Sequence, residues 1–268
     1  MIHEALTTLT LPYPGGRTKT VRVFMPAHEE GETFPAVYMT DGQNLFEDDN
    51  VQFGSWFTRE AVRAERESSG KAAIIVGIHN DGHPAERAND LTPQSIGEMM
   101  FPPDMPEEIR KMIHPQGEVF DDFVVNTVMP AIEAQFPVQT GREHTAFCGS
   151  SSGGLQTFFT VLSHPDVFSA AGALSPCLML FHPEAMNRWI REKAKAKAKE
   201  LPFLFLYSGG ADPLEQAICQ STEGVCAMLA DCYPATLIQK DIRPEQPHNE
   251  SSWAPVFREF LHAFLSRS

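Results

Sequence analysis

The sequence predicts an α/β fold in which helices cover both faces of a largely parallel sheet. Short apolar runs alternate with longer helical patterns along most of the chain. Several of these runs are almost continuously apolar, which is typical of strands covered on both faces. A composition of 42% hydrophobic and 21% charged residues excludes a disordered chain, a collagen-like repeat and a coiled coil.

The expected strands follow one another at intervals that leave room for crossover helices. Residues 18–25 alternate in polarity and are rich in β-branched side chains, which is typical of an outer strand. Residues 34–39 and 72–78 are short apolar runs, as expected for buried strands. The series continues at residues 144–148, 168–174, 202–207 and 235–242.

Two helices are evident because apolar residues recur every three or four positions. One pattern lies between residues 120 and 132, and the other between residues 253 and 264. The basic run at residues 191–200 indicates a solvated helix face. Residues 80–117 break this rhythm, since they are rich in proline and methionine. This stretch follows a strand, so we expect an insertion that shapes a pocket at the carboxyl edge of the sheet; an ordinary surface excursion is the alternative.

Charge and composition narrow the classes of partner. Asp and Glu outnumber Lys and Arg by 35 to 21, giving a net charge of −14 that argues against nucleic acid or an anionic membrane as a partner. No apolar run is long enough to span a membrane, and the N-terminal residues lack the pattern of a signal peptide. Five cysteines without a regular spacing indicate free thiols. We therefore expect a cytoplasmic protein; its oligomeric state is open, with a homodimer as one option.

The strongest chemical signal is a G-x-S-x-G motif formed by Gly149, Ser151 and Gly153. An apolar strand precedes it and a helical segment follows, which is the context this motif requires. The sharp turn forces the serine into an unfavourable backbone conformation, and side chains at the glycine positions would clash. Such a turn lifts the Ser151 hydroxyl above the sheet and directs the N–H of Ser152 toward an oxyanion. A Gly/Ser-rich turn without chemistry is the alternative.

A serine nucleophile needs a base, and position selects one histidine. In hydrolases with this turn the chain order is Ser, then Asp or Glu, then His. His182 comes too early for that order, and His262 lies within the last amphipathic helix. His248 lies in a loop between the last strand and the last helix, from which it can reach Ser151. A solvent-exposed loop histidine is the alternative.

The acid is expected between them, and Asp212 is the first candidate. It follows two glycines at the end of the strand at residues 202–207, where it could accept a hydrogen bond from His248. Because Pro213 comes next, capping of the following helix is a serious alternative. Four other carboxylates remain as fallbacks: Glu215, Asp231, Asp241 and Glu245.

A second oxyanion donor is expected in the loop at residues 39–46. Gly42 allows the backbone to approach a ligand closely, and the backbone N–H of Gln43 is the candidate donor. A plain Asp-Gly turn is the alternative.

A metal site is a further possibility, and four residues are candidates for it: His79, Asp81, His83 and His114. Their spacing matches no established metal site. No cofactor or metal is therefore expected.

Taken together, these motifs resemble the Putative esterase family of α/β-hydrolases. This group is related to enterochelin esterases, feruloyl and acetylxylan esterases, S-formylglutathione hydrolase and the mycolyltransferases. The likeness extends from about residue 21 to residue 265. Its most specific pieces are YMTDGQNLF at residues 38–46, GSSSGG at 149–154, LSP at 174–176 and HNESSW at 248–253. A further family segment, an Arg followed by an acidic residue and Thr-Pro, is matched by Arg87, Asp90, Thr92 and Pro93.

The resemblance implies a single α/β-hydrolase domain over residues 1–268, with about eight strands in a mostly parallel sheet. It implies the same functional residues as the motifs do: Ser151 as nucleophile, His248 as base, Asp212 as acid, and the N–H groups of Gln43 and Ser152 as oxyanion donors. One departure is that relatives often carry Trp shortly after the Ser-Pro pair, where this chain has Cys177, Leu178 and Met179.

We therefore expect a serine carboxylic-ester hydrolase that acts through an acyl-enzyme on a small to medium intracellular ester. An acyltransferase with the same residues and a non-catalytic ligand-binding protein are the alternatives. For Arg87, the choice is between holding a substrate carboxylate and a structural ion pair with Asp90 or Glu86. The candidates for substrate binding are Asp41, Asn44, Arg87, Ser150 and Met179.

Overall fold

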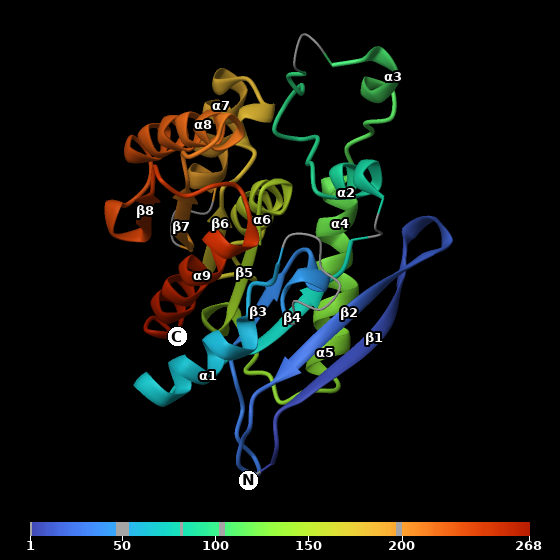
Figure 1. Ribbon diagram of the computed structural model, residues 1–268, viewed down its shortest axis with the longest axis vertical. Coiled ribbons are helices and arrows are strands. Elements are labelled where there is room, and N and C mark those ends of the chain that lie inside the picture. The colour runs from blue at the N-terminus through green and yellow to red at the C-terminus, as the bar shows by residue number, and fades with distance from the viewer. Residues whose placement is uncertain (1, 47–53, 81–82, 102–104, 197–199) are drawn as a thin grey trace.

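A central sheet of eight strands organises the computed structural model, which describes residues 2–46, 54–80, 83–101, 105–196 and 200–268. The strand order is β1-β2-β4-β3-β5-β6-β7-β8, and all neighbours from β4 to β8 are parallel (Figure 1). The strands are β1 (Ala5–Tyr13), β2 (Arg17–Met25), β3 (Ala36–Met39), β4 (Ile74–Ile78), β5 (Thr145–Ser150), β6 (Ala170–Leu174), β7 (Phe203–Ser208) and β8 (Ile238–Ile242). The predicted α/β fold is therefore confirmed.

Burial explains why the central strands are recognisable from sequence. Every residue of β3, β4, β5, β6 and β7 is buried, so these strands are almost continuously apolar, as is typical of strands covered by helices on both faces. The edge strand β8 is half-exposed and carries charged residues. The predicted strand at residues 235–242 is correspondingly shorter, because its first three residues form a 3₁₀ turn.

The strand β1 is absent from the sequence-based prediction. It pairs with β2 in an antiparallel hairpin, in register from Ala5 opposite Met25 to Tyr13 opposite Arg17. Its residues alternate between exposed and half-buried positions, as expected of a strand at the edge of a sheet. Gly15 and Gly16 both have positive φ angles in the connecting turn, a conformation that glycine adopts without steric cost.

Helices pack on this sheet in two groups. The helices α1 and α9 contact each other, whereas α4, α6, α7 and α8 form a second contiguous set (Figure 1). The helix bounds are α1 (Thr58–Ser69), α2 (Pro84–Asp90), α3 (Glu107–Arg110), α4 (Gly117–Phe123), α5 (Met129–Glu133), α6 (Ser152–Ser163), α7 (Pro183–Ala196), α8 (Pro213–Ala230) and α9 (Glu250–Leu265). A π-helical turn at Val124–Val128 joins α4 to α5, so the helix expected at residues 120–132 is continuous.

The stretch at residues 80–117 leaves β4 at its carboxyl end and is partly helical. It contains the short helices α2 and α3, which lie beyond the end of α4 in Figure 1. An isolated bridge between Met99 and Phe181 ties it to the segment before α7. Its role in shaping a pocket stays a prediction. Within the described ranges, no helix is both long and apolar enough to cross a membrane.

Candidate active site

The turn from β5 into α6 has a strained backbone at Ser151. This residue has φ 59° and ψ −124°, a region that non-glycine residues rarely occupy. Its N–H donates to the Leu174 carbonyl of the neighbouring strand at 3.0 Å, which holds the turn against the sheet. A Cβ atom at Gly149 would lie 2.7 Å from the Gly153 carbonyl oxygen, and one at either glycine would collide with Thr40 Oγ1. Gly149 is therefore required by the close approach of the Gly153 backbone and of Thr40, and Gly153 by the close approach of the Thr40 side chain.

The structure brings Ser151 and His248 together across 97 residues of sequence. His248 Nε2 lies 3.1 Å from Ser151 Oγ, within hydrogen-bond distance. His248 lies in the loop that joins β8 to α9, and Asn249 caps α9 by accepting the Ser252 N–H. The helix cap fixes where the loop ends, and the imidazole lies beside Ser151 in the turn at residues 149–153, the nucleophile turn.

The carboxylate that meets the imidazole is Glu215, and the prediction for Asp212 is wrong. His248 Nδ1 lies 2.8 Å from Glu215 Oε1. Asp212 instead caps α8, since its Oδ1 accepts the Glu215 N–H at 3.0 Å. Its Oδ2 accepts the backbone N–H of His248 at 2.9 Å, so Asp212 holds the loop and not the ring. Both oxygens of the short Asp212 side chain accept hydrogen bonds from backbone N–H groups. Glu215, about one helical turn later, is buried in the molecule.

Glu215 is held rigidly in a buried position. The residue is fully buried, and its second oxygen, Oε2, accepts the Gly209 N–H at 3.0 Å and the Ser208 hydroxyl at 3.2 Å. A buried carboxylate needs such partners, because an unpaired one would be costly to desolvate. By contrast, Asp212 is more exposed, and the backbone N–H of Glu215 is the main reason its pKa lies below the usual value.

Two further residues contact the Ser151–His248–Glu215 arrangement, and sequence reasoning did not assign either to it. The Trp253 ring meets the His248 ring edge to face, with centroids 4.9 Å apart, and its Nε1 donates to Ser175 Oγ at 2.9 Å. Cys177 Sγ lies 3.4 Å from Ser151 Oγ. Burial raises the pKa of the Cys177 thiol, which favours its neutral form. The HNESSW and LSP segments were the available signals, since both residues lie in or beside them.

The loop after β3 lies against the nucleophile turn. It forms a 3₁₀ turn at Gly42–Asn44, in which the Asn44 N–H donates to the Asp41 carbonyl at 2.9 Å. A Cβ atom at Gly42 would overlap the backbone of Gly77 in β4, so only glycine permits this packing. A Cβ atom at Gly153 would lie 3.3 Å from Asp41 Oδ2, which shows how closely the loop approaches the nucleophile turn.

The candidates for substrate binding have protein partners or are buried. Arg87 forms an ion pair with Asp41 through two hydrogen bonds, so neither of its expected partners is correct. Asp90 instead pairs with Lys19, and Asn44 donates to Glu250 Oε1 at 3.0 Å. Two candidates remain. Ser150 is buried at the end of β5, and Met179 is half-buried in a short 3₁₀ turn.

The predicted alternative of a metal site receives no support in the described ranges, which contain no group of three or more potential ligands. One of its four residues, Asp81, lies outside them. His83 Nδ1 accepts the Ala85 N–H at the start of α2. Burial lowers the pKa of His79 to about 4, so its imidazole is neutral at physiological pH.

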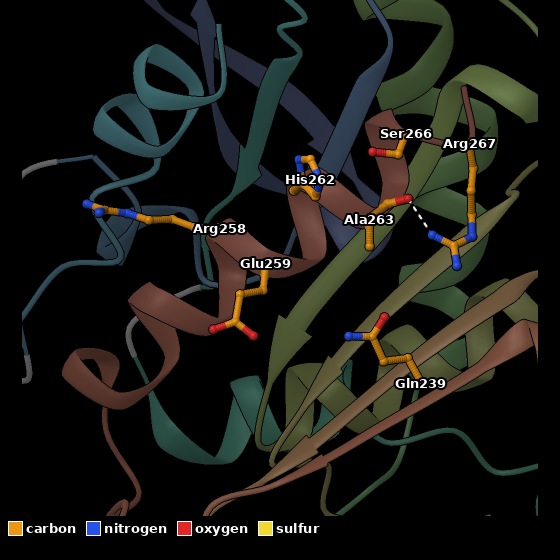
Figure 2. A pocket seen from close by; sticks show the side chains of 7 residues that line it. All are labelled: Gln239, Arg258, Glu259, His262, Ala263, Ser266 and Arg267. Atoms are coloured by element: carbon orange, nitrogen blue, oxygen red, sulfur yellow. Dashed lines mark hydrogen bonds between the residues drawn. The ribbon is translucent and has the colours of Figure 1, made fainter. Parts of the chain in front are cut away.

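A separate hollow lies between the edge strand β8 and helix α9 (Figure 2). Arg267 lines this hollow. It donates to the Ala263 carbonyl at 2.7 Å, and its Cζ lies 3.8 Å from the centroid of the Phe203 ring. The lining residues are Gln239, Arg258, Glu259, His262, Ala263, Ser266 and Arg267. None of them belongs to the Ser151–His248–Glu215 arrangement.

Comparisons with known proteins agree with this fold. The chain is 29% identical over 176 residues to a siderophore triacetylfusarinine C esterase of Aspergillus fumigatus, a match that covers 61% of this chain and 52% of that protein. The chain spans about half the length of the curated relatives it matches.

Solved structures resemble it over nearly its whole length. The siderophore hydrolase EstA of Aspergillus nidulans has a TM-score of 0.71 at 20% identity, covering 98% of this chain and 95% of that one. An IroE-like serine hydrolase of Shewanella oneidensis has a TM-score of 0.73 at 18% identity, covering 98% and 80%. These likenesses confirm the α/β-hydrolase fold that the motifs imply. The family described as "Putative esterase" matches residues 15–203, more than half of the chain, and the chain therefore belongs to that family.

Proposed function

We propose that this protein is a serine carboxylic-ester hydrolase whose triad is Ser151, His248 and Glu215. The observation that carries the proposal is one continuous chain of hydrogen-bond contacts. Ser151 Oγ lies 3.1 Å from His248 Nε2, and His248 Nδ1 lies 2.8 Å from Glu215 Oε1. A nucleophile, a base that contacts it and a carboxylate that orients the base are the parts required for acyl transfer through a serine.

The geometry supports a two-step reaction. His248 Nε2 takes the hydroxyl proton as Ser151 Oγ attacks the ester carbonyl, forming the C–O bond of a tetrahedral intermediate. The carbonyl re-forms, the alcohol leaves with the proton from His248, and an acyl-enzyme remains on Ser151. Water then attacks the acyl group by the same sequence, which releases the acid and restores the serine. Glu215 fixes the tautomer with the proton on Nδ1 and stabilises the imidazolium that forms in each step.

The oxyanion is proposed to accept hydrogen bonds from the backbone N–H groups of Ser152 and Gln43. Ser152 begins α6, and the first N–H groups of a helix lack acceptors within the helix, so the Ser152 N–H is available to the carbonyl oxygen of an ester attacked by Ser151. Gln43 lies in the turn that packs against the nucleophile turn through Thr40 and Asp41. Fixed donors of this type act where the charge develops, and no cofactor is required.

For the substrate, we propose a small to medium ester bound at the carboxyl edge of the sheet, beside the stretch at residues 80–117. Two of the proteins named above, a triacetylfusarinine C esterase and the hydrolase EstA, are named for siderophores, which supports a small-molecule ester. All five cysteines are free thiols, which supports a reducing compartment such as the cytoplasm and hence an intracellular ester. Met179, in the half-buried turn just after Cys177, is proposed to contact the acyl group.

The test is turnover of p-nitrophenyl acetate and butyrate by the wild type and by Ser151→Ala. We expect the variant to lose at least about 10⁴-fold in kcat, since loss of the nucleophile leaves only residual catalysis. Ser68→Ala, an exposed serine on α1, is the matched control and should retain full activity. Undiminished turnover in Ser151→Ala would refute the proposal. Product analysis with a competing alcohol separates hydrolysis from acyl transfer.

A further inference from the structure

An ion pair between the half-buried Arg87 and the buried Asp41 links the stretch after β4 to the loop that carries Gln43. Arg87 on α2 donates from Nε to Asp41 Oδ1 at 2.7 Å and from Nη2 to Oδ2 at 2.8 Å. Asn80 Nδ2 adds a third bond to Oδ1 at 2.7 Å. Burial raises the pKa of Asp41, but the Arg87 charge and the bonds from Arg87, Asn80 and Gln43 outweigh it, so the pKa lies below its usual range. Asp41 is therefore a buried carboxylate that stays ionised.

The backbone of Asp41 is strained, and its side chain holds it in place. The residue has φ 53° and ψ 45°, a left-handed conformation that is unfavourable for a residue with a Cβ. Such a conformation persists only where the surroundings impose it. The three bonds to the carboxylate supply that constraint. The strained residue begins the 3₁₀ turn, because its carbonyl accepts the Asn44 N–H.

Gln43 belongs to the same network of hydrogen bonds. Its side-chain Oε1 accepts the Asn80 N–H at 3.3 Å, and its side chain also contributes a hydrogen bond to Asp41. The direction of the Gln43 backbone N–H thus depends on how Asp41 and Asn80 are held. Since Asp41 Oδ2 also lies against Gly153, the network joins the turn to the nucleophile segment.

The helix α2 has an anchor of its own, and this explains the spacing of Arg87 and Asp90. Three residues after Arg87, the buried Asp90 carboxylate lies 2.8 Å from Lys19 Nζ and accepts the Tyr13 hydroxyl at 3.0 Å. Residues three apart lie on the same side of a helix. One side of α2 therefore contacts the β1–β2 hairpin through Asp90 and the Gln43 turn through Arg87.

We propose that Arg87 is a positioning residue that acts through Asp41 to hold the Gln43 N–H where it stabilises the oxyanion. This inference rests on the proposed esterase function and adds a residue to it. Two nitrogens of the Arg87 guanidinium donate hydrogen bonds to Asp41, and the negative Asp41 carboxylate compensates the positive charge of Arg87. Arg87 in this state is a poor receptor for a substrate carboxylate. Its loss should therefore lower kcat and leave KM nearly unchanged.

The experiment compares Arg87→Lys, Arg87→Met and the double variant Asp41→Asn/Arg87→Met. Lysine keeps the charge but lacks the planar pair of donors, and the double variant avoids leaving an unpaired buried charge. Arg66→Met is the matched control, because Arg66 on α1 pairs with Glu32 and has a side-chain exposure of 33%, against 27% for Arg87. Each variant is assayed with neutral p-nitrophenyl acetate and with a p-nitrophenyl ester that carries a terminal carboxylate. Inhibition by phenylboronic acid, which forms a tetrahedral adduct on a serine, reports the oxyanion site directly.

We expect kcat to fall about 10- to 100-fold for both esters in all three Arg87 variants, with KM within threefold, because displacing an oxyanion donor costs less than deleting it. The inhibition constant for phenylboronic acid should rise in parallel, and the pH profile of kcat/KM should not move. Unchanged kcat with p-nitrophenyl acetate, or a loss confined to KM of the anionic ester, would overturn the positioning role. Ser151→Ala is run alongside: if it stays active, the proposed function itself fails, whereas an inactive Ser151→Ala with normal Arg87 variants rejects only this inference.

Discussion

His248 Nδ1 lies 2.8 Å from Glu215 Oε1. This contact distinguishes Glu215 from Asp212, a carboxylate only three residues earlier in the chain. Glu215 binds the imidazole ring, whereas Asp212 binds the backbone N–H of the same histidine and caps α8. Glu215 is therefore placed to orient the imidazole ring, and Asp212 to hold the loop that carries it.

Exchange of each carboxylate for its amide should separate the two roles. Glu215→Gln should lower kcat at least about 100-fold, because the amide cannot stabilise the imidazolium and can favour the wrong tautomer. Asp212→Asn should keep kcat within a few-fold and lower the free energy of unfolding by about 1 kcal/mol or less, since asparagine also caps helices. Steady-state kinetics measure kcat, and urea unfolding measures the free energy of unfolding. Equal losses of kcat in the two variants would contradict this division.

The tryptophan that contacts His248 should matter for both stability and rate. Trp253→Phe removes the N–H that binds Ser175, a buried residue with a positive φ of 43°, and leaves its hydroxyl without that donor. We expect a loss of about 1–3 kcal/mol in the free energy of unfolding and a several-fold fall in kcat. Trp189→Phe is the matched control, because the buried Trp189 Nε1 has no hydrogen-bond partner within the described ranges. It should lose less stability and keep its kcat; identical behaviour of the two variants would reject the explanation.

An ion pair away from the site should make stability depend on pH. His164 Nε2 lies 2.6 Å from Asp121 Oδ2, and this hydrogen bond is the main cause of the raised pKa of His164. A raised pKa means that the folded state favours the protonated imidazole. The stabilisation is fully present below the unfolded pKa of about 6.5 and is lost as pH rises through the folded value. Urea unfolding at pH 6 and pH 9 should show a smaller pH-dependent change in His164→Gln than in the wild type; the same change in both would contradict it.

Glycines of the nucleophile turn should tolerate no side chain. Gly153→Ala would force a Cβ against Thr40 Oγ1 and close to Asp41, so we expect a large loss of both stability and activity. Gly224→Ala on α8 is the control, because a Cβ there meets nothing within 4 Å. It should stabilise the protein by about 0.5–1 kcal/mol through helix propensity and keep full activity. Thermal unfolding and turnover measure both; an active and stable Gly153→Ala would show that close packing is not the reason for this glycine.

The sequence predicted features that are encoded locally. The buried strands are almost continuous apolar runs, and the G-x-S-x-G turn has a fixed backbone geometry, so both could be recognised without coordinates. The strand β1 was missed although its residues alternate. The seven residues of α2 are too few for a helical period to be recognised.

The rest depends on side-chain direction and on contacts between distant segments. Asp212 and Glu215 both lie in the chain interval where the acid is expected, and only the path of α8 decides which of them points at His248. The partner of Arg87 is 46 residues away in sequence, whereas its expected partners were neighbours on the same helix. The order of strands β4, β3 and β5 in the sheet brings that distant carboxylate beside α2.

The most direct measurement of the central claim is the site of covalent labelling by a fluorophosphonate. Only a serine activated by an adjacent base reacts rapidly with this reagent. Intact mass and peptide mapping should show one adduct per chain, on the Ser151 hydroxyl, and none in Ser151→Ala. Absence of an adduct, or an adduct on another residue, would contradict the account.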